Sequence, residues 1–105
     1  MIFHCLGIPH TITSQAYCAC AYTAKVLKFI KMMTARGHTC YHYGHPDSEV
    51  ACENVPVISR LTFAKDYGDQ DTANQFFKFD LSDPSYKEHQ RRAAEEIGKR
   101  KRGPD

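Results

Sequence analysis

The first 44 residues, MIFHCLGIPHTITSQAYCACAYTAKVLKFIKMMTARGHTCYHYG, decide the fold of this chain. Residues 1–6 form a nearly unbroken apolar run that ends at Gly7, and residues 7–14 form a polar loop. A helical pattern follows, and a second strand-like run occupies residues 39–44. A strand, a helix and a parallel strand in this order predict a β-α-β unit whose first loop lies at the carboxyl edge of the sheet. We therefore expect any chemistry of the chain in that loop.

A long amphipathic helix is predicted between the two strands. Its apolar residues recur at spacings of three and four from Ala19 to Met33, and Gly37 supplies the stop. Thr13 or Ser14 is expected to cap the first turn, because a side-chain oxygen there accepts from the free N–H groups.

The remaining sequence predicts shorter elements. Residues 44–55 are polar and indicate a loop, residues 56–59 a third strand, and residues 61–67 one or two helical turns. Residues 76–83 fit either a strand or an ordered loop. A last helix is expected from Pro84 onward, because proline suits the first helical turn.

Composition bounds the class of protein. The chain has 105 residues and a net charge of +2, so its overall charge does not favour a nucleic-acid partner. No apolar run approaches the ~18 residues that span a membrane, and no secretory signal is recognisable. We expect a cytoplasmic protein. Its five cysteines are odd in number and lie mostly in apolar positions, so we expect free thiols rather than a disulfide framework.

These elements predict an α/β fold. The expectation is a Rossmann-like, three-layer half domain with a short parallel sheet, spanning residues 1–105 as a single partial domain. Three short strands leave an exposed sheet edge, through which the chain could self-associate. We expect the sequence to be the N-terminal part of a larger protein.

A resemblance to a known family lies in the segment KMMTARGHTCYHYG (residues 31–44) and in the opening MIFHCLGIPHT. The turn Arg36-Gly37-His38, with Gly7 in the first loop, resembles the N-terminal segment of GT-B type glycosyltransferases found in large viruses, phages and bacteria. The resemblance implies the acceptor-side, N-terminal portion of an enzyme that transfers sugar from a nucleotide-sugar donor.

The resemblance also implies partners. The donor-binding domain has no counterpart in this sequence, so it would come from another domain or subunit, and the acceptor would be a glycan or another hydroxyl compound. No cofactor is expected in this chain itself. The alternative is a non-catalytic α/β binding or interaction module, or one subunit of a split glycosyltransferase.

His10 is the candidate catalytic residue. A histidine titrates near neutral pH and can take a proton from an acceptor hydroxyl. Inverting members of the resembled superfamily can place a histidine in this loop. Two other readings stay open: His10 contacts substrate without catalysis, or it is bonded to backbone or water.

The candidates for substrate binding share the carboxyl edge of the predicted sheet: Gly7, Pro9, Thr11, Thr13, His42 and His45. Gly7 either permits close approach of a ligand or only releases the chain from the strand. The threonines suit a hydroxylated or anionic ligand at a helix N-terminus, or simply cap it.

A metal is not expected. Cys40 and Cys52 lie near the two histidines of the second strand, which makes zinc conceivable, but their spacings match no regular zinc module.

Overall fold

The structure is a computed structural model that describes residues 1–68, 71–74 and 82–100. Three strands form a parallel sheet in the order β1 (Ile2–Leu6), β2 (Thr39–Gly44), β3 (Glu53–Pro56). The helices are η1 (Gln15–Tyr17, a 3₁₀ turn), α1 (Ala21–Ala35), α2 (Arg60–Tyr67) and α3 (Pro84–Arg100). The chain is thus a small α/β protein with a parallel sheet, as the sequence predicts at this level.

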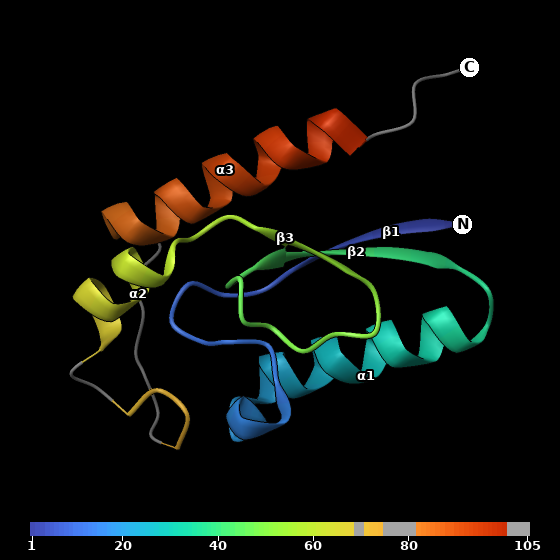
Figure 1. Cartoon of the computed structure of the whole chain (residues 1–105), viewed down its shortest axis with the longest axis horizontal. Coiled ribbons are helices and arrows are strands. Elements are labelled where there is room, and N and C mark those ends of the chain that lie inside the picture. The colour runs from blue at the N-terminus through green and yellow to red at the C-terminus, as the bar shows by residue number, and fades with distance from the viewer. Residues whose placement is uncertain (69–70, 75–81, 101–105) are drawn as a thin grey trace.

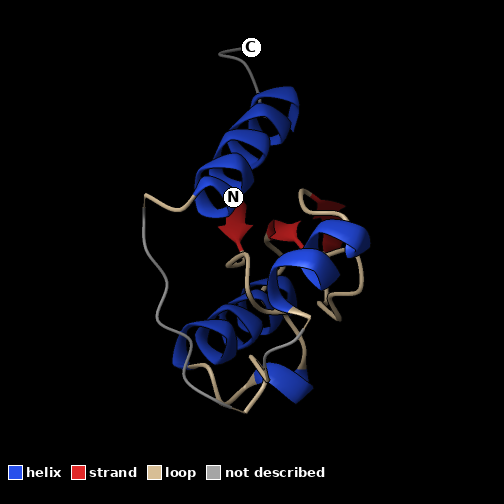
Figure 2. Cartoon of the chain, turned by 90° about the vertical axis from the view of Figure 1, so that its left-hand side faces the viewer, coloured by secondary structure: helices blue, strands red, loops and turns tan. Residues whose placement is uncertain are grey.

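The two long helices lie on opposite faces of the sheet (Figures 1 and 2). The core between the sheet and α3 is formed by Tyr43, Val55, Val57 and Ala93, which are all buried. On the α1 face, the ring of Phe3 meets that of Phe29 edge to face at 5.2 Å. Apolar burial on both faces is what a parallel sheet requires.

Four elements follow the sequence closely. Strands β1 and β2 lie where the apolar runs place them, and α2 and α3 begin at Arg60 and Pro84. Gly37 follows α1 with a φ of 86°, a conformation that favours glycine. The expectation for residues 76–83 falls mostly outside the described residues, because residues 75–81 are not described.

The third strand was predicted in the wrong place. It covers Glu53–Pro56 rather than residues 56–59, so the predicted loop over 44–55 ends earlier. Val57 N–H still donates to Gly44 C=O at 3.0 Å, which adds one bond beyond the strand. Val57 and Ile58 are buried in the core although they lie just beyond the end of β3.

The start of the first helix was also predicted wrongly. Helix α1 begins at Ala21, after the separate 3₁₀ turn, and not near Thr13 or Ser14. Neither residue caps it: the residue before the helix is Cys20, whose side chain makes no capping bond. Ser14 precedes the 3₁₀ turn, and its hydroxyl donates to Ile12 C=O instead of capping that turn.

Within the described part of the chain, no helix combines the length and the apolar character that a membrane crossing needs.

Candidate functional site

The loop after β1 is fixed at both ends by hydrogen bonds. Gly7 N–H donates to Tyr43 C=O at 2.8 Å and so prolongs the β1–β2 ladder. The hydroxyls of Thr11 and Thr23 lie 2.9 Å apart, which ties the loop to α1. Thr13 exchanges two bonds with the loop after β2, donating from N–H to Ser48 Oγ and accepting at C=O from the amide of residue 49. This loop is therefore held in one conformation by neighbours on two sides.

Gly7 is required by close packing. A Cβ at this position would lie 3.1 Å from His42 Nε2 and 3.1 Å from Thr13 Oγ1. Both side chains are almost completely buried, so neither has room to yield. The close approach at Gly7 is an approach to protein side chains, and the same residue also contributes to a cavity wall.

A cavity of about 540 Å³ lies at the carboxyl end of β1. It is lined by residues 6–10, the start of α1 (residues 19–22), residues 72–74, and Tyr86, His89 and Gln90 of α3. None of these described lining residues carries a formal charge as Asp, Glu, Lys or Arg. Its volume falls in the usual range for small-molecule sites, which are mostly apolar with a few polar groups.

His10 lies in the wall of this cavity and is 5 % exposed. Burial lowers the pKa of its imidazole to about 4, since the charged form loses its hydration. Its ring lies 6.2 Å from that of Tyr67, at the end of α2. His10 is therefore a neutral imidazole at pH 7.

His89 contributes to the same cavity from α3 and was not predicted from the sequence. It is 3 % exposed, and its Nε2 has no hydrogen-bond partner among the described residues. Burial, with smaller contributions from nearby His42 and Arg92, lowers its pKa to about 4. The cavity wall thus includes a neutral ring whose buried nitrogen is unsatisfied.

The first turn of α1 presents free backbone donors beside the cavity. The N–H groups of Ala21, Tyr22 and Thr23 precede the first intrahelical bond, which runs from Ala24 N–H to Cys20 C=O at 3.0 Å. Among the described residues no capping side chain satisfies them, and no acidic residue lies in this turn. Ala21 and Tyr22 both line the cavity, so the positive end of the helix dipole lies at its wall.

His42, a candidate for substrate binding in the sequence, lies outside the described lining of the cavity. It is completely buried. The amide of Asn54 donates to the carbonyls of His45 and Pro46, so its oxygen faces His42 Nδ1 at 2.8 Å. His42 must then carry its proton on Nδ1. Its Nε2 has no partner among the described residues.

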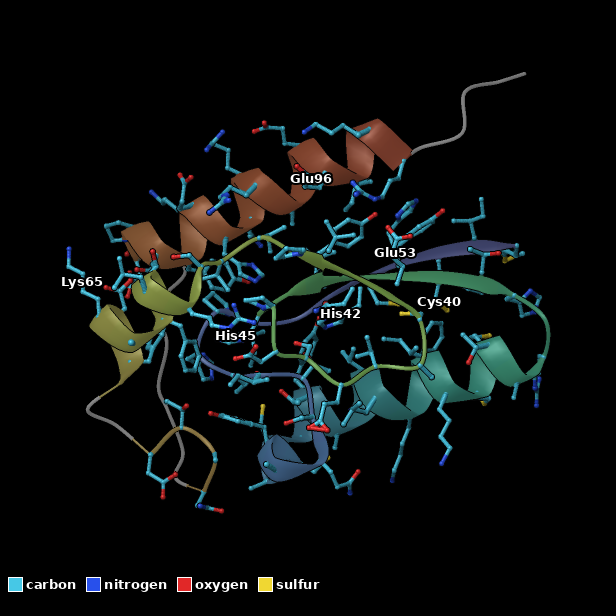
Figure 3. The ribbon with its side chains drawn as sticks, in the orientation of Figure 1. Cys40, His42, His45, Glu53, Lys65 and Glu96 are labelled. Atoms are coloured by element: carbon cyan, nitrogen blue, oxygen red, sulfur yellow. The ribbon has the colours of Figure 1, made fainter. Side chains whose placement is uncertain are left out.

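His45 serves the loop after β2. Its Nδ1 accepts from Asp47 N–H at 3.0 Å, so this nitrogen is unprotonated. The ring is 3 % exposed and contacts that of Phe63 on α2 at 4.7 Å. Burial lowers its pKa despite the nearby Asp47 carboxylate, and the pair is therefore not an ion pair at neutral pH. Figure 3 shows His42 and His45 at the end of β2 that faces α2.

The five cysteines are free thiols. Burial raises the pKa of Cys5 and of Cys52 to about 11, so both stay protonated at neutral pH. No group of three or more metal-ligating side chains is found among residues 1–68, 71–74 and 82–100.

Of the predicted site residues, Gly7, Pro9 and His10 meet at the cavity. The others, Thr11, Thr13, His42 and His45, are buried outside the described lining and support the loops by hydrogen bonds. The contribution of α3 was missed. The sequence held one indication of it, because His89 shares a helical face with Ala93 and Ile97. On such an apolar face a histidine is unusual.

In comparisons with known proteins, no family model, curated protein or solved structure matches this chain.

Proposed function

We propose that this chain binds the hydroxylated acceptor of a glycosyl transfer, as the Rossmann-like, acceptor-side part of a GT-B type glycosyltransferase. The observation that carries the proposal is the cavity at the carboxyl end of β1, with Gly7, Pro9 and His10 in its wall. Ligands of open parallel sheets bind at this edge. The Arg36-Gly37-His38 turn at the start of β2 supports the family. The nucleotide-sugar donor would bind to a separate domain or subunit.

The role of His10 in this proposal is to accept a hydrogen bond or a proton from the acceptor hydroxyl. Its neutral state at pH 7 suits that role, but a base with a pKa of about 4 holds a proton weakly.

The burial of His10, which lowers its pKa to about 4, favours a second candidate function, a binding module that holds a sugar without transferring it. Mutation separates the two. In the presence of the donor-binding partner, His10→Ala lowers turnover by about 10²-fold if His10 is the base. An unchanged rate would remove His10 from the mechanism, and acceptor binding without any turnover by the wild-type chain and its partner would assign the chain to binding alone.

Acceptor binding is tested first, by titrating the ¹⁵N-labelled chain with neutral monosaccharides and disaccharides and following its amide resonances. We expect saturable shifts at residues 7–10 and 19–22, and their loss in His10→Ala. The matched control is His38→Ala, a second histidine that lies immediately before β2 and outside the cavity lining. A folded protein that shows no saturable shifts with any sugar contradicts the proposal.

A further inference from the structure

The charges of this chain are unevenly distributed along its sequence. Residues 1–46 contain four lysine or arginine residues and no aspartate or glutamate, so every acidic residue of the chain lies at position 47 or later. The four cations belong to α1 or to the residue that follows it: Lys25, Lys28, Lys31 and Arg36. The net charge of +2 for the whole chain therefore includes one strongly cationic helix.

These cations lie on the outer side of α1. The helix packs against β1, β2 and η1, and it lies across the sheet from α3 (Figures 1 and 2). All four cations are exposed, and no ion pair joins any of them to an acidic residue in the part of the chain that the structure describes. We call the exposed residues of this helix and its last cation the α1 face: Ala21, Tyr22, Lys25, Lys28, Lys31, Met32, Ala35 and Arg36.

Two large apolar side chains share the α1 face with the cations. Tyr22 is 45 % exposed and Met32 is 44 % exposed. Met32 lies about one turn after Lys28, and around the helix axis it falls between Lys28 and Lys25. The Tyr22 hydroxyl donates to Leu6 C=O at 2.6 Å, so the polar group of this side chain is satisfied by β1. The α1 face thus combines positive charge with exposed apolar surface.

Helix α3 has the charge pattern of an ordinary solvent-exposed helix. Its cations and anions form pairs three or four residues apart, as Arg91 does with Glu88 and Glu95. Such pairs balance positive and negative charge within one helix. Helix α1 cannot form them because it contains no acidic residue. Its positive charge is therefore available to an external partner.

We propose that the α1 face binds the surface of an anionic phospholipid membrane. The lipid phosphates supply the negative charge that the four cations lack within the chain. Tyr22 and Met32 favour a lipid surface over a nucleic acid, because a phosphodiester backbone offers little apolar surface, whereas the boundary between headgroups and acyl chains buries such side chains. The lysine stems lie along this boundary with their ammonium groups at the phosphates. The inference is independent of the proposed function.

The experiment is co-sedimentation of the intact chain with large unilamellar vesicles. We expect the chain to bind phosphatidylcholine vesicles that contain about 30 % phosphatidylglycerol, and to bind pure phosphatidylcholine at least about tenfold more weakly. Binding to the anionic vesicles should weaken as the salt concentration is raised from about 0.1 M to about 0.5 M, because salt screens the attraction. Equal binding to both vesicles, or no binding to either, overturns the inference.

Charge reversal tests whether the α1 face makes the contact. Lys28→Glu removes one cation at an exposed helical position, where glutamate forms a helix about as well as lysine. We expect it to weaken binding to the anionic vesicles by at least about fivefold, the contribution of one lysine near such a surface. The matched control is Lys87→Glu, the same change at an exposed position of α3. An equal loss in the control means that net charge and not the α1 face decides binding, which overturns the inference.

The apolar part of the α1 face distinguishes a lipid surface from a nucleic acid. Met32→Gln leaves the charge and the helix propensity of α1 nearly unchanged, and it should weaken binding to the anionic vesicles by at least about threefold. Leu61→Gln, at an 81 % exposed apolar residue of α2, should change it little. Tighter binding to a DNA duplex than to the anionic vesicles, unaffected by Met32→Gln, assigns the face to nucleic acid and overturns the inference.

Discussion

Replacement of Gly7 by alanine tests how closely the loop after β1 packs on β2. The new Cβ would lie 3.1 Å from His42 Nε2 and 3.1 Å from Thr13 Oγ1. Both neighbours are buried, and His42 is also held by its 2.8 Å hydrogen bond to Asn54. Overpacking of this kind costs about 1–3 kcal/mol. Because alanine restricts the unfolded chain more than glycine does, the substitution also stabilises the folded state by about 0.4–1 kcal/mol. We therefore expect a net decrease in the free energy of unfolding of about 1–2 kcal/mol.

The assay is urea unfolding at pH 7.5, with Gly98→Ala as the matched control. A Cβ at Gly98 meets nothing within 4 Å, and the residue lies in the last turn of α3. This substitution should therefore stabilise the protein, by up to about 0.5–1 kcal/mol, the value for a helix interior. The two glycine-to-alanine changes are expected to have opposite signs. A neutral or stabilising effect of Gly7→Ala would refute the packing argument.

A double mutant locates the strain. Thr13→Ala removes one of the two atoms that the new Cβ approaches. We expect Gly7→Ala to be less destabilising in that background than alone, with a coupling of about 0.5 kcal/mol or more. Strict additivity would mean that the strain at Gly7 does not involve Thr13.

Three further outcomes are expected from the same unfolding assay. The pKa values of His10 and His89 are about 4 in the folded state and about 6.5 in the unfolded state, so the unfolded state binds more protons below neutral pH. The free energy of unfolding should therefore fall as the pH drops from about 7 to 4, by up to about 1.4 kcal/mol per pH unit for each group. His89→Gln should flatten this pH profile. Asn54→Ala leaves the buried His42 Nδ1 without its 2.8 Å partner and should destabilise by about 1–3 kcal/mol, which a wild-type midpoint would contradict. Asp47→Ala breaks an ion pair with an exposed arginine of α2 and should leave the midpoint unchanged within error, because such surface pairs contribute little.

The sequence predicts the elements that have a clear hydrophobic pattern or a clear boundary residue. Strand β1 is a nearly unbroken apolar run that ends next to Gly7, β2 is a strand-like run that ends at Gly44, and α3 begins at its proline. Strand β3 has no such signal, because Glu53, Asn54 and Pro56 are all poor strand formers. It forms as an edge strand through pairing with β2, and that pairing depends on contacts distant in sequence.

The candidate site also has a part that the sequence predicts and a part that it does not. The loop with His10 follows from the rule that parallel strands place function at their carboxyl ends. The wall on α3 does not follow, since no local pattern says which turn of a later helix packs over that loop. The cap at the start of α1 was misplaced for a related reason. Thr13 was available as a cap, but its backbone bonds to the loop after β2 instead.

Every strand pair in the described sheet is parallel, and this has a consequence for how fast the protein folds. A parallel pair cannot begin as a hairpin, so β1 meets β2 only after the chain has closed a loop that contains all of α1. Helix formation takes about a microsecond or less, whereas non-local strand pairing is slow. The contact between the rings of Phe3 and Phe29 joins β1 to α1 across a shorter stretch of sequence than the pairing of β1 with β2 does. The folding rate should therefore depend on the stability of α1 as much as on the strands themselves.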